Sequence, residues 1–309
     1  MATRAPILIV GSMAFDDLEL PSGSFPNTIG GSATYAAFAA SAFGSDVRVV
    51  AVVGDDFPEE TLKKLGARGV TTTGIERASG KTFRWAGRYD ADLCGRTTLD
   101  TQLNVFASFS PKIPDGFKRC PIVLLGNIHP TLQTEVLESV ESPKLVLADT
   151  MNFWIQGEPK ALEKLLKKVD VLIINDEEAR EISGIHNIRK AAADVRKRGP
   201  KAVIIKRGEH GALLFDEVGM FFAPGFPLED VVDPTGAGDS FAGGLVGHVA
   251  KELETHDRIG PATLRHAMLF GTATASYCVE AVGTERVASI AARDVEARMG
   301  EIRSLFHLP

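Results

Sequence analysis

Short runs of apolar, β-forming residues alternate with segments of helical spacing along nearly the whole chain. The apolar runs cover residues 7–10, 47–53, 122–125, 144–148, 171–174, 202–206 and 212–215. Helical spacing is found at 33–43, 59–65, 159–168, 177–183 and 188–197, and then at 236–249, 261–279 and 291–304. Apolar strands that alternate with helices indicate a mostly parallel sheet covered by helices on both faces. The sequence therefore predicts an α/β fold.

Two segments break this alternation. Residues 15–28 are polar and contain proline and glycine, and residues 81–109 alternate like a strand but carry Arg and Asp among aromatic residues. Neither can be a buried parallel strand, so both are predicted to form a small β-sheet that projects from the main body. We expect one domain over 1–309, with a mobile β-lid at about 12–30 and 82–108. Surface strands without a lid function are the alternative, and any homodimer is expected to form through the lid.

Charge and cysteine content exclude several classes of protein. The 309 residues include 34 basic and 40 acidic side chains, a net charge of -6, with no basic block that would indicate a nucleic-acid partner. The cysteines are few, widely spaced and odd in number: Cys94, Cys120 and Cys278. They form no zinc pattern and indicate a reducing compartment. The first apolar stretch, residues 7–10, is too short for a membrane span. We expect a cytoplasmic protein without a membrane partner.

Residues 233–246, with the sequence DPTGAGDSFAGGLV, are the segment most suited to chemistry. Gly236, Ala237 and Gly238 leave backbone N–H groups accessible to a ligand, and a buried helix begins directly after them. The N-terminal end of that helix would favour a negatively charged phosphoryl group. Asp239 can then be a general base for an attacking hydroxyl, or a carboxylate that only stabilises the helix terminus.

These motifs resemble those of the ribokinase-like, or PfkB, family of carbohydrate and nucleoside kinases. DPTGAGDSFAGGLV matches the C-terminal signature of that family. About 200 residues earlier, small residues fall in step with its N-terminal signature: Gly30, Gly31, Ala33, Ala37, Gly44 and Gly54. With the motifs described below, the resemblance covers essentially the whole chain.

The resemblance implies a three-layer α/β/α sandwich with a small β-lid, and an ATP-dependent kinase that uses Mg²⁺. The expected reaction is phosphorylation of a hydroxymethyl group on a small sugar or related polyol. Asp239 matches the catalytic base of the family, and Gly236, Ala237 and Gly238 match its anion hole. Two alternatives are an adenosine-like nucleoside kinase and a catalytically silent relative that binds or regulates.

Several positions match the nucleotide and metal sites of the family. Asn175 and Glu178 match a motif that holds Mg²⁺ through water, although an asparagine N-cap with acids in the first helical turn is the alternative. Lys206, Gly208 and Gly211 match a nucleotide-binding turn, and the same residues could form a simple hairpin. Lys206 could reach a phosphate or face solvent. By the same match, Thr272 would lie near the adenine.

The remaining positions concern a cation and the acceptor. Asp233, Thr235 and Gly283 match residues that bind K⁺ in many relatives. Asp16 would accept hydrogen bonds from substrate hydroxyls, and Gly30 and Gly31 would let the substrate approach the backbone. The family pattern has an asparagine where this chain has Tyr35, whose ring could stack on a base or only fill space.

Overall fold

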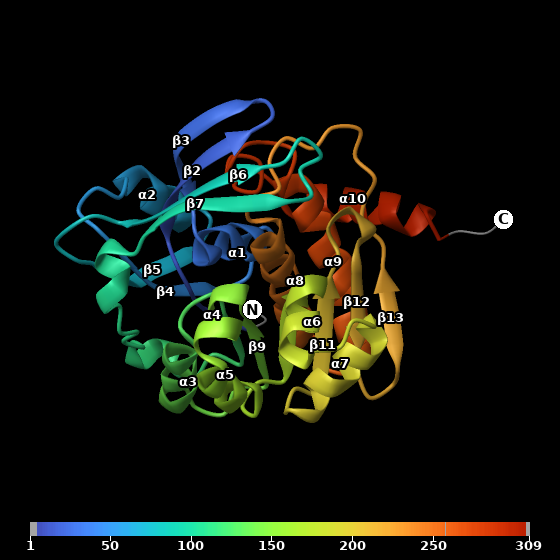
Figure 1. Ribbon diagram of the computed structural model, residues 1–309. Helices are drawn as coiled ribbons and strands as arrows, with labels where there is room; N and C mark the ends of the chain where they lie inside the picture. Colours follow the sequence, from blue (N-terminus) through green and yellow to red (C-terminus); the bar gives the residue numbers. More distant parts are fainter. Residues whose placement is uncertain (1–4, 257, 307–309) are drawn as a thin grey trace.

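The computed structural model describes residues 5–256 and 258–306. Its largest element is a nine-stranded sheet in the order β13-β12-β11-β10-β9-β8-β1-β4-β5 (Figure 1). Its strands are β1 (Ile7–Val10), β4 (Val47–Val53), β5 (Val70–Arg77), β8 (Ile122–Leu125), β9 (Leu145–Asp149), β10 (Val171–Asn175), β11 (Ala202–Lys206), β12 (Ala212–Phe215) and β13 (Met220–Ala223). All neighbouring strands from β11 to β5 are paired in parallel. The pairs β11–β12 and β12–β13 are antiparallel.

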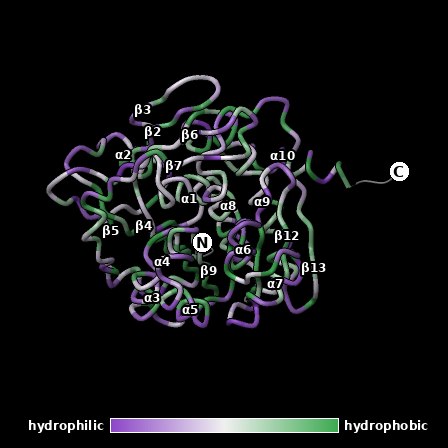
Figure 2. The backbone as a smooth tube through the Cα atoms, viewed as in Figure 1, coloured by the Kyte–Doolittle hydropathy of each residue, from purple (hydrophilic) through white to green (hydrophobic). Residues whose placement is uncertain are grey.

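Apolar side chains cover both faces of this sheet. In β1, Ile7 and Ile9 belong to one buried hydrophobic cluster, whereas Leu8 and Val10 belong to the other. Because successive side chains of a strand point to opposite faces, a continuous apolar run is required when both faces are buried. Figure 2 shows hydrophobic residues along the sheet and hydrophilic residues along the outer loops. The prediction of a mostly parallel, doubly covered sheet is confirmed.

Helices form the two outer layers. One face packs against α1 (Ser32–Ser41), α2 (Glu59–Ala67), α8 (Ala237–Leu253), α9 (Pro261–Cys278) and α10 (Ala292–Ser304). The other packs against α3 (Pro130–Ser139), α4 (Asn152–Gly157), α5 (Pro159–Leu166), α6 (Asp176–Ser183) and α7 (Ile188–Lys197). No helix in the described part of the chain is both long and apolar enough to cross a membrane.

A separate four-stranded sheet, here called the second sheet, lies beside the main body (Figure 1). Its order is β3-β2-β6-β7, with β2 (Ala14–Leu20), β3 (Gly23–Gly30), β6 (Phe83–Tyr89) and β7 (Arg96–Gln102). These strands fall within segments 12–30 and 82–108, for which the sequence predicts a small sheet. Its function as a lid stays a prediction.

The alternation of apolar runs does not predict every element. It misses β5 and β13, which are edge strands of the main sheet with several exposed or half-buried residues. An edge strand has a neighbour on one side only and does not need a continuous apolar run. The alternation also misses α3 and α4, whose buried faces are narrow.

Candidate active site

The predicted site residues meet at the carboxyl edge of the parallel strands. Asp149 ends β9, Asn175 ends β10 and Lys206 ends β11. Gly11 and Ser12 follow β1 at the same edge, because all four strands run parallel. Ligands of open α/β sheets bind outside the carboxyl ends of the strands. The sheet topology therefore brings together residues that are almost 200 positions apart in the sequence.

The start of α8 offers free backbone amides. Gly236 is the N-cap and has a positive φ of 75°, a conformation that strongly favours glycine. Among the described residues, the N–H groups of Gly236 and Gly238 have no hydrogen-bond partner, whereas the Ala237 N–H donates to the Pro234 carbonyl at 3.2 Å. Of the three predicted anion-hole amides, two are thus free to bind a phosphate oxygen, and that of Ala237 is already engaged.

Lys206 faces into this site and not into solvent. Its Nζ lies 3.5 Å from Oδ2 of Asp149, and its side chain is 20% exposed. A Cβ placed on Gly238 would lie only 2.8 Å from the same Nζ. Burial opposes the charge of Lys206, but Asp149, Glu178 and Asp239 outweigh that effect and raise the pKa of the ammonium group. A permanent positive charge therefore lies beside the free amides.

Asp239 is held in an environment that disfavours its ionised form. Burial and then the nearby charge of Asp149 raise its pKa to about 7, although Lys206 acts in the opposite direction. A carboxylate with a pKa near neutrality can accept a proton from a hydroxyl group and release it again. The position in the first turn of α8 does not require such a pKa, so a helix-terminus function alone leaves it unexplained.

Asn175 and Glu178 form a capping box at the start of α6. The Glu178 N–H donates to Asn175 Oδ1 at 2.7 Å, and the Asn175 N–H donates to Glu178 Oε2 at 2.8 Å. This is the N-cap alternative left open by the sequence. Glu178 is 4% exposed, and burial followed by the charge of Asp149 raises its pKa to about 7.

The residues present fit Mg²⁺ that is held mainly by phosphates and water. Oε1 of Glu178 makes no hydrogen bond to the residues that the structure describes, and Asp149 adds a second carboxylate nearby. Over 5–256 and 258–306, no cluster of three or more His, Cys, Asp or Glu side chains forms an all-protein metal centre. Mg²⁺ commonly binds to one or two carboxylates together with substrate phosphates.

Asp16, which is predicted to bind the acceptor, has a pKa far above its usual value. Its side chain is 5% exposed, and burial together with the charges of Asp233, Asp239 and Asp17 raises its pKa to about 8. Gly30 makes room for it, because a Cβ at that position would lie 1.9 Å from Oδ2 of Asp16. The missing side chain of Gly30 therefore leaves space for the Asp16 carboxyl group. The sequence led us to expect that this space would serve the substrate.

Gly31 and Tyr35 lie at the start of α1. Gly31 is the N-cap of α1 with a φ of 93°, and a Cβ there would lie 2.5 Å from the Ser12 carbonyl. Tyr35 is 1% exposed, and its ring occupies the space where a side chain on Gly236 would lie. Its position and its burial favour the alternative that the ring fills space, and stacking on a base stays a prediction. Its hydroxyl has no hydrogen-bond partner in the described structure.

The carboxylate of Asp233 is occupied by backbone amides. Its Oδ1 accepts from the Thr235 N–H at 2.9 Å, and its Oδ2 accepts from the Gly283 N–H at 2.8 Å. These bonds connect the loop before α8 to the segment after α9. K⁺ binding by Asp233, Thr235 and Gly283 stays a prediction.

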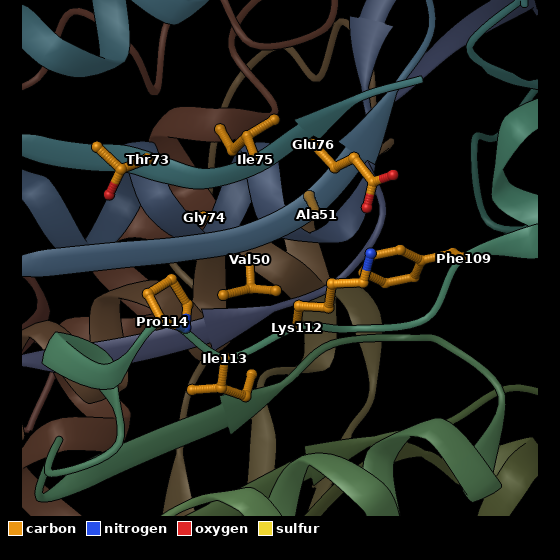
Figure 3. Close-up of a pocket in the computed structure, with 10 residues that line it drawn as sticks. All are labelled: Val50, Ala51, Thr73, Gly74, Ile75, Glu76, Phe109, Lys112, Ile113 and Pro114. Atoms are coloured by element: carbon orange, nitrogen blue, oxygen red, sulfur yellow. The ribbon is translucent and has the colours of Figure 1, made fainter. Parts of the chain in front are cut away.

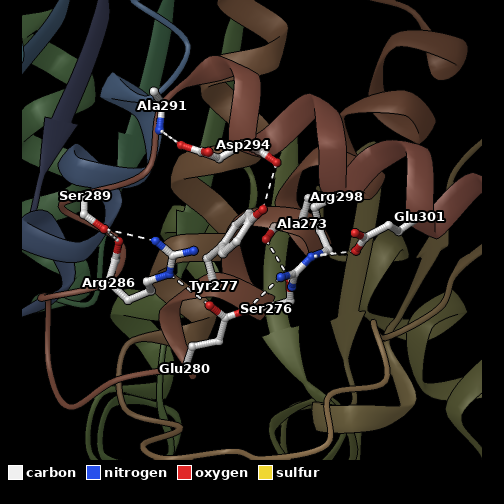
Figure 4. A network of polar contacts seen from close by, with 10 residues as sticks. All are labelled: Ala273, Ser276, Tyr277, Glu280, Arg286, Ser289, Ala291, Asp294, Arg298 and Glu301. Atoms are coloured by element: carbon white, nitrogen blue, oxygen red, sulfur yellow. Dashed lines mark hydrogen bonds and ion pairs between the residues drawn. The ribbon is translucent and has the colours of Figure 1, made fainter.

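A polar network holds this segment in place (Figure 4). Glu280 accepts from Arg286 Nε at 2.9 Å and from Arg298 at 2.7 Å. Arg298 also donates to Ser276 Oγ and lies over the ring of Tyr277. The side chain of Arg298 is only 10% exposed, so these contacts fix the base of the segment that carries Gly283.

Two further predicted nucleotide positions lie in a tight hairpin. The Arg207 N–H donates to the Gly211 carbonyl at 2.8 Å, and Gly208 and Gly211 both have positive φ. The hairpin alternative is therefore present, and nucleotide binding there stays a prediction. Thr272 is 6% exposed in the middle of α9, which packs on α8. Its expected position near the adenine also stays a prediction.

Sequence reasoning assigns no function to Asp149, although this residue raises the pKa of Asp239 and Glu178. Its position at the end of a predicted strand is the signal that marks it. The pocket in Figure 3 lies elsewhere, between β4, β5 and residues 109–114, and it contains no predicted site residue. The predicted site residues therefore gather at the strand ends and not in that pocket.

Comparisons with known proteins agree with this geometry. A model of the pfkB family carbohydrate kinases matches residues 4–290. A cytidine kinase from Thermococcus kodakarensis is 28% identical over 261 residues, which is 82% of this chain and 92% of that relative.

Two solved structures share the fold. A putative ribokinase II from E. coli in complex with ATP and Mg²⁺ has a TM-score of 0.78 at 18% identity, over 96% of this chain and 99% of that chain. A nucleoside kinase from Burkholderia thailandensis in complex with inosine has a TM-score of 0.73 at 21% identity, over 96% of this chain and 97% of that chain. The fold and the enzyme class expected from the sequence are thus confirmed, and the chain belongs to the pfkB family of carbohydrate kinases.

Proposed function

We propose that this kinase transfers the γ-phosphoryl group of ATP to a hydroxymethyl group of a small sugar or nucleoside, with Mg²⁺ bound to the phosphates. The observation that best supports this proposal is the position of Asp239. Its carboxyl group, with a pKa of about 7, lies at the start of α8 beside the free amides of Gly236 and Gly238. The fold shared with a kinase solved with ATP and Mg²⁺ supports this choice of donor.

In the proposed reaction, the acceptor oxygen forms a bond to the γ-phosphorus and the bond from that phosphorus to the β–γ bridging oxygen breaks. Asp239 takes the hydroxyl proton, and ADP leaves with the electron pair of the broken bond. The amides of Gly236 and Gly238 and the ammonium of Lys206 stabilise the charge on the transferring group. Glu178 would hold Mg²⁺ through water, and the ion would supply positive charge to neutralise the phosphates. Asp16 orients the acceptor hydroxyls.

A nucleoside is the favoured acceptor class because an aromatic residue lies beside Asp16. Trp85 of β6 is the register partner of Asp16 in β2, and its ring extends over Gly87 on the same face. An indole next to a hydroxyl-binding carboxylate suits a ligand with both a ribose and a flat base. The similarity to a cytidine kinase over most of both chains supports the same choice.

The Asp239→Asn variant tests the proposal. It keeps the size of the side chain but cannot accept the proton, so kcat should fall about 10²-fold or more while Mg·ATP affinity changes little and Tm does not fall. Asp294→Asn is the matched control, since Asp294 occupies the first turn of α10 and caps it through the Ala291 N–H at 2.8 Å. The control should lower Tm slightly and leave kcat unchanged.

The acceptor is identified by ATP consumption with a panel of cytidine, inosine, ribose and deoxyribose. Preference for the nucleosides is expected. An Asp239→Asn enzyme that phosphorylates its acceptor within a few-fold of the wild type would refute the proposed base.

A further inference from the structure

Three arginines of the second sheet differ in their partners. Arg84 pairs with Asp17 at 2.7 Å, and Arg88 pairs with Glu19. Arg96, the first residue of β7, makes no ion pair with any residue that the structure describes, although it is exposed. A cation without a carboxylate partner, in a chain with excess acid, is available for an anionic ligand.

The register of the second sheet places Arg96 over the active site. Arg96 is paired with Tyr89, whose hydroxyl lies 3.0 Å from Thr235 Oγ1 in the loop before α8. The guanidinium carbon of Arg96 lies 5.6 Å from the centre of the Trp85 ring, and Trp85 is the register partner of Asp16. Arg96 therefore lies between the acceptor residue and the loop that binds the transferring phosphate.

The electrostatics agree with this position. The charge of Arg96 lowers the pKa of three carboxyl groups that come from different elements, Asp16 of β2, Glu178 of α6 and Asp239 of α8. All three carboxyl groups therefore lie within the range of the Arg96 charge. Lys206 is the other positive group there, and Asp149 already pairs with it.

We propose that Arg96 is a further catalytic residue, delivered by the second sheet, whose guanidinium binds the γ-phosphate of ATP. Arginine suits this function because its planar fork can donate two hydrogen bonds to phosphate oxygens. Lys206 and the free amides of Gly236 and Gly238 come from the main body, whereas Arg96 comes from the second sheet. The proposal rests on the proposed kinase function and assigns the second sheet a chemical contribution besides covering the substrate.

Equilibrium binding of Mg·ATP and Mg·ADP, measured by calorimetry without acceptor, tests this contact. Arg96→Ala should weaken Mg·ATP binding about 10-fold or more, because a hydrogen-bonded charge is lost, and should change Mg·ADP binding less than about twofold. Arg96→Lys should recover part of the loss, since it retains the charge without the fork. Arg88→Ala is the matched control on the same sheet and should change neither affinity.

Turnover measurements supply the second readout. With the acceptor found in the panel, Arg96→Ala should lower kcat about 10-fold or more and leave the acceptor KM within about twofold. Equal weakening of ATP and ADP, or no weakening of either, would overturn the proposal. A rise in the acceptor KM alone would overturn it as well, because Arg96 would then bind the acceptor. A wild-type enzyme that binds Mg·ATP but phosphorylates nothing would refute the proposed function, while the ATP-to-ADP comparison would still decide the contact.

Discussion

All residues of β1, β8 and β9 in the main sheet are buried, whereas every residue of β7 in the second sheet is exposed. The main sheet is enclosed by two large hydrophobic clusters. The second sheet has one small cluster, formed by Leu18, Leu20 and Tyr89, against which Val282 of the main body packs. Lys206 and Asp239 are therefore held by a large core, whereas movement of the second sheet relative to the body stays a prediction.

The contacts between the two regions are both polar and apolar, and Phe15 of β2 belongs to one of the large clusters of the main body. Thr235 Oγ1 donates a hydrogen bond to the Tyr89 hydroxyl across the junction. Within the body, the N–H of Gly283, next to Val282, donates to Asp233. Asp16, the proposed acceptor-binding residue, belongs to the second sheet, and Asp239, the proposed base, belongs to the body. Assembly of the site thus depends on how the two regions meet, and three experiments separate their contributions.

The largest expected difference is in stability. Leu124→Ala in β8 and Leu18→Ala in β2 remove the same atoms from side chains that are each 1% exposed. Leu124→Ala should cost about 2–5 kcal/mol of unfolding free energy, because it leaves a cavity in the main core. Leu18→Ala should cost less and raise the acceptor KM, because it loosens the second sheet. Chemical denaturation and steady-state kinetics measure both, and equal losses of stability would remove the contrast.

The second expected effect is a pH-dependent change of stability caused by Asp16, which lies in β2 of the second sheet. Because the pKa of Asp16 is about 8 in the folded protein and near 4 when exposed, its stabilising contribution is complete below pH 4 and is lost as the pH rises toward 8. Asp16→Asn does not titrate. Its Tm should therefore exceed that of the wild type by an amount that grows between pH 5 and pH 8, reaching about 3 °C or more.

The same Asp16→Asn variant should bind the acceptor more weakly, since an amide NH₂ replaces a carboxyl oxygen and cannot accept a hydrogen bond from a substrate hydroxyl. Thermal melts at several pH values and acceptor KM are the measurements. A Tm difference that does not depend on pH would contradict the raised pKa, and an unchanged KM would contradict the position of Asp16 in the pocket.

The smallest effect concerns the hydrogen bond across the junction. Tyr89→Phe removes the hydroxyl that contacts Thr235 and should raise the acceptor KM about 2- to 10-fold with little change in Tm. Tyr277→Phe is the control within the body, since its hydroxyl donates to the Asp294 carbonyl at 2.9 Å. The control should lower Tm and leave KM unchanged. The reverse pattern would show that Tyr89 contributes to stability and not to closure.

Periodicity and glycine placement were sufficient to predict the inner strands of the main sheet and the start of α8, but not the edge strands β5 and β13. Continuous apolar runs such as residues 171–174 are visible in the sequence because burial on both faces demands them locally. The segment from Gly236 to Asp239 is equally visible, because a tight turn into a helix needs glycine at a positive φ. These features depend on neighbours within a few positions along the chain.

Tertiary structure alone decided which side chains meet. Tyr35 packs under Gly236, Lys206 pairs with Asp149, and Arg96 lies over Trp85 and the acidic groups of the site. Nothing in the local sequence distinguishes Arg96 from Arg84 or Arg88. The register between strands and the docking of the second sheet decide which arginine lacks a carboxylate partner among the described residues, because such contacts join residues far apart in the chain.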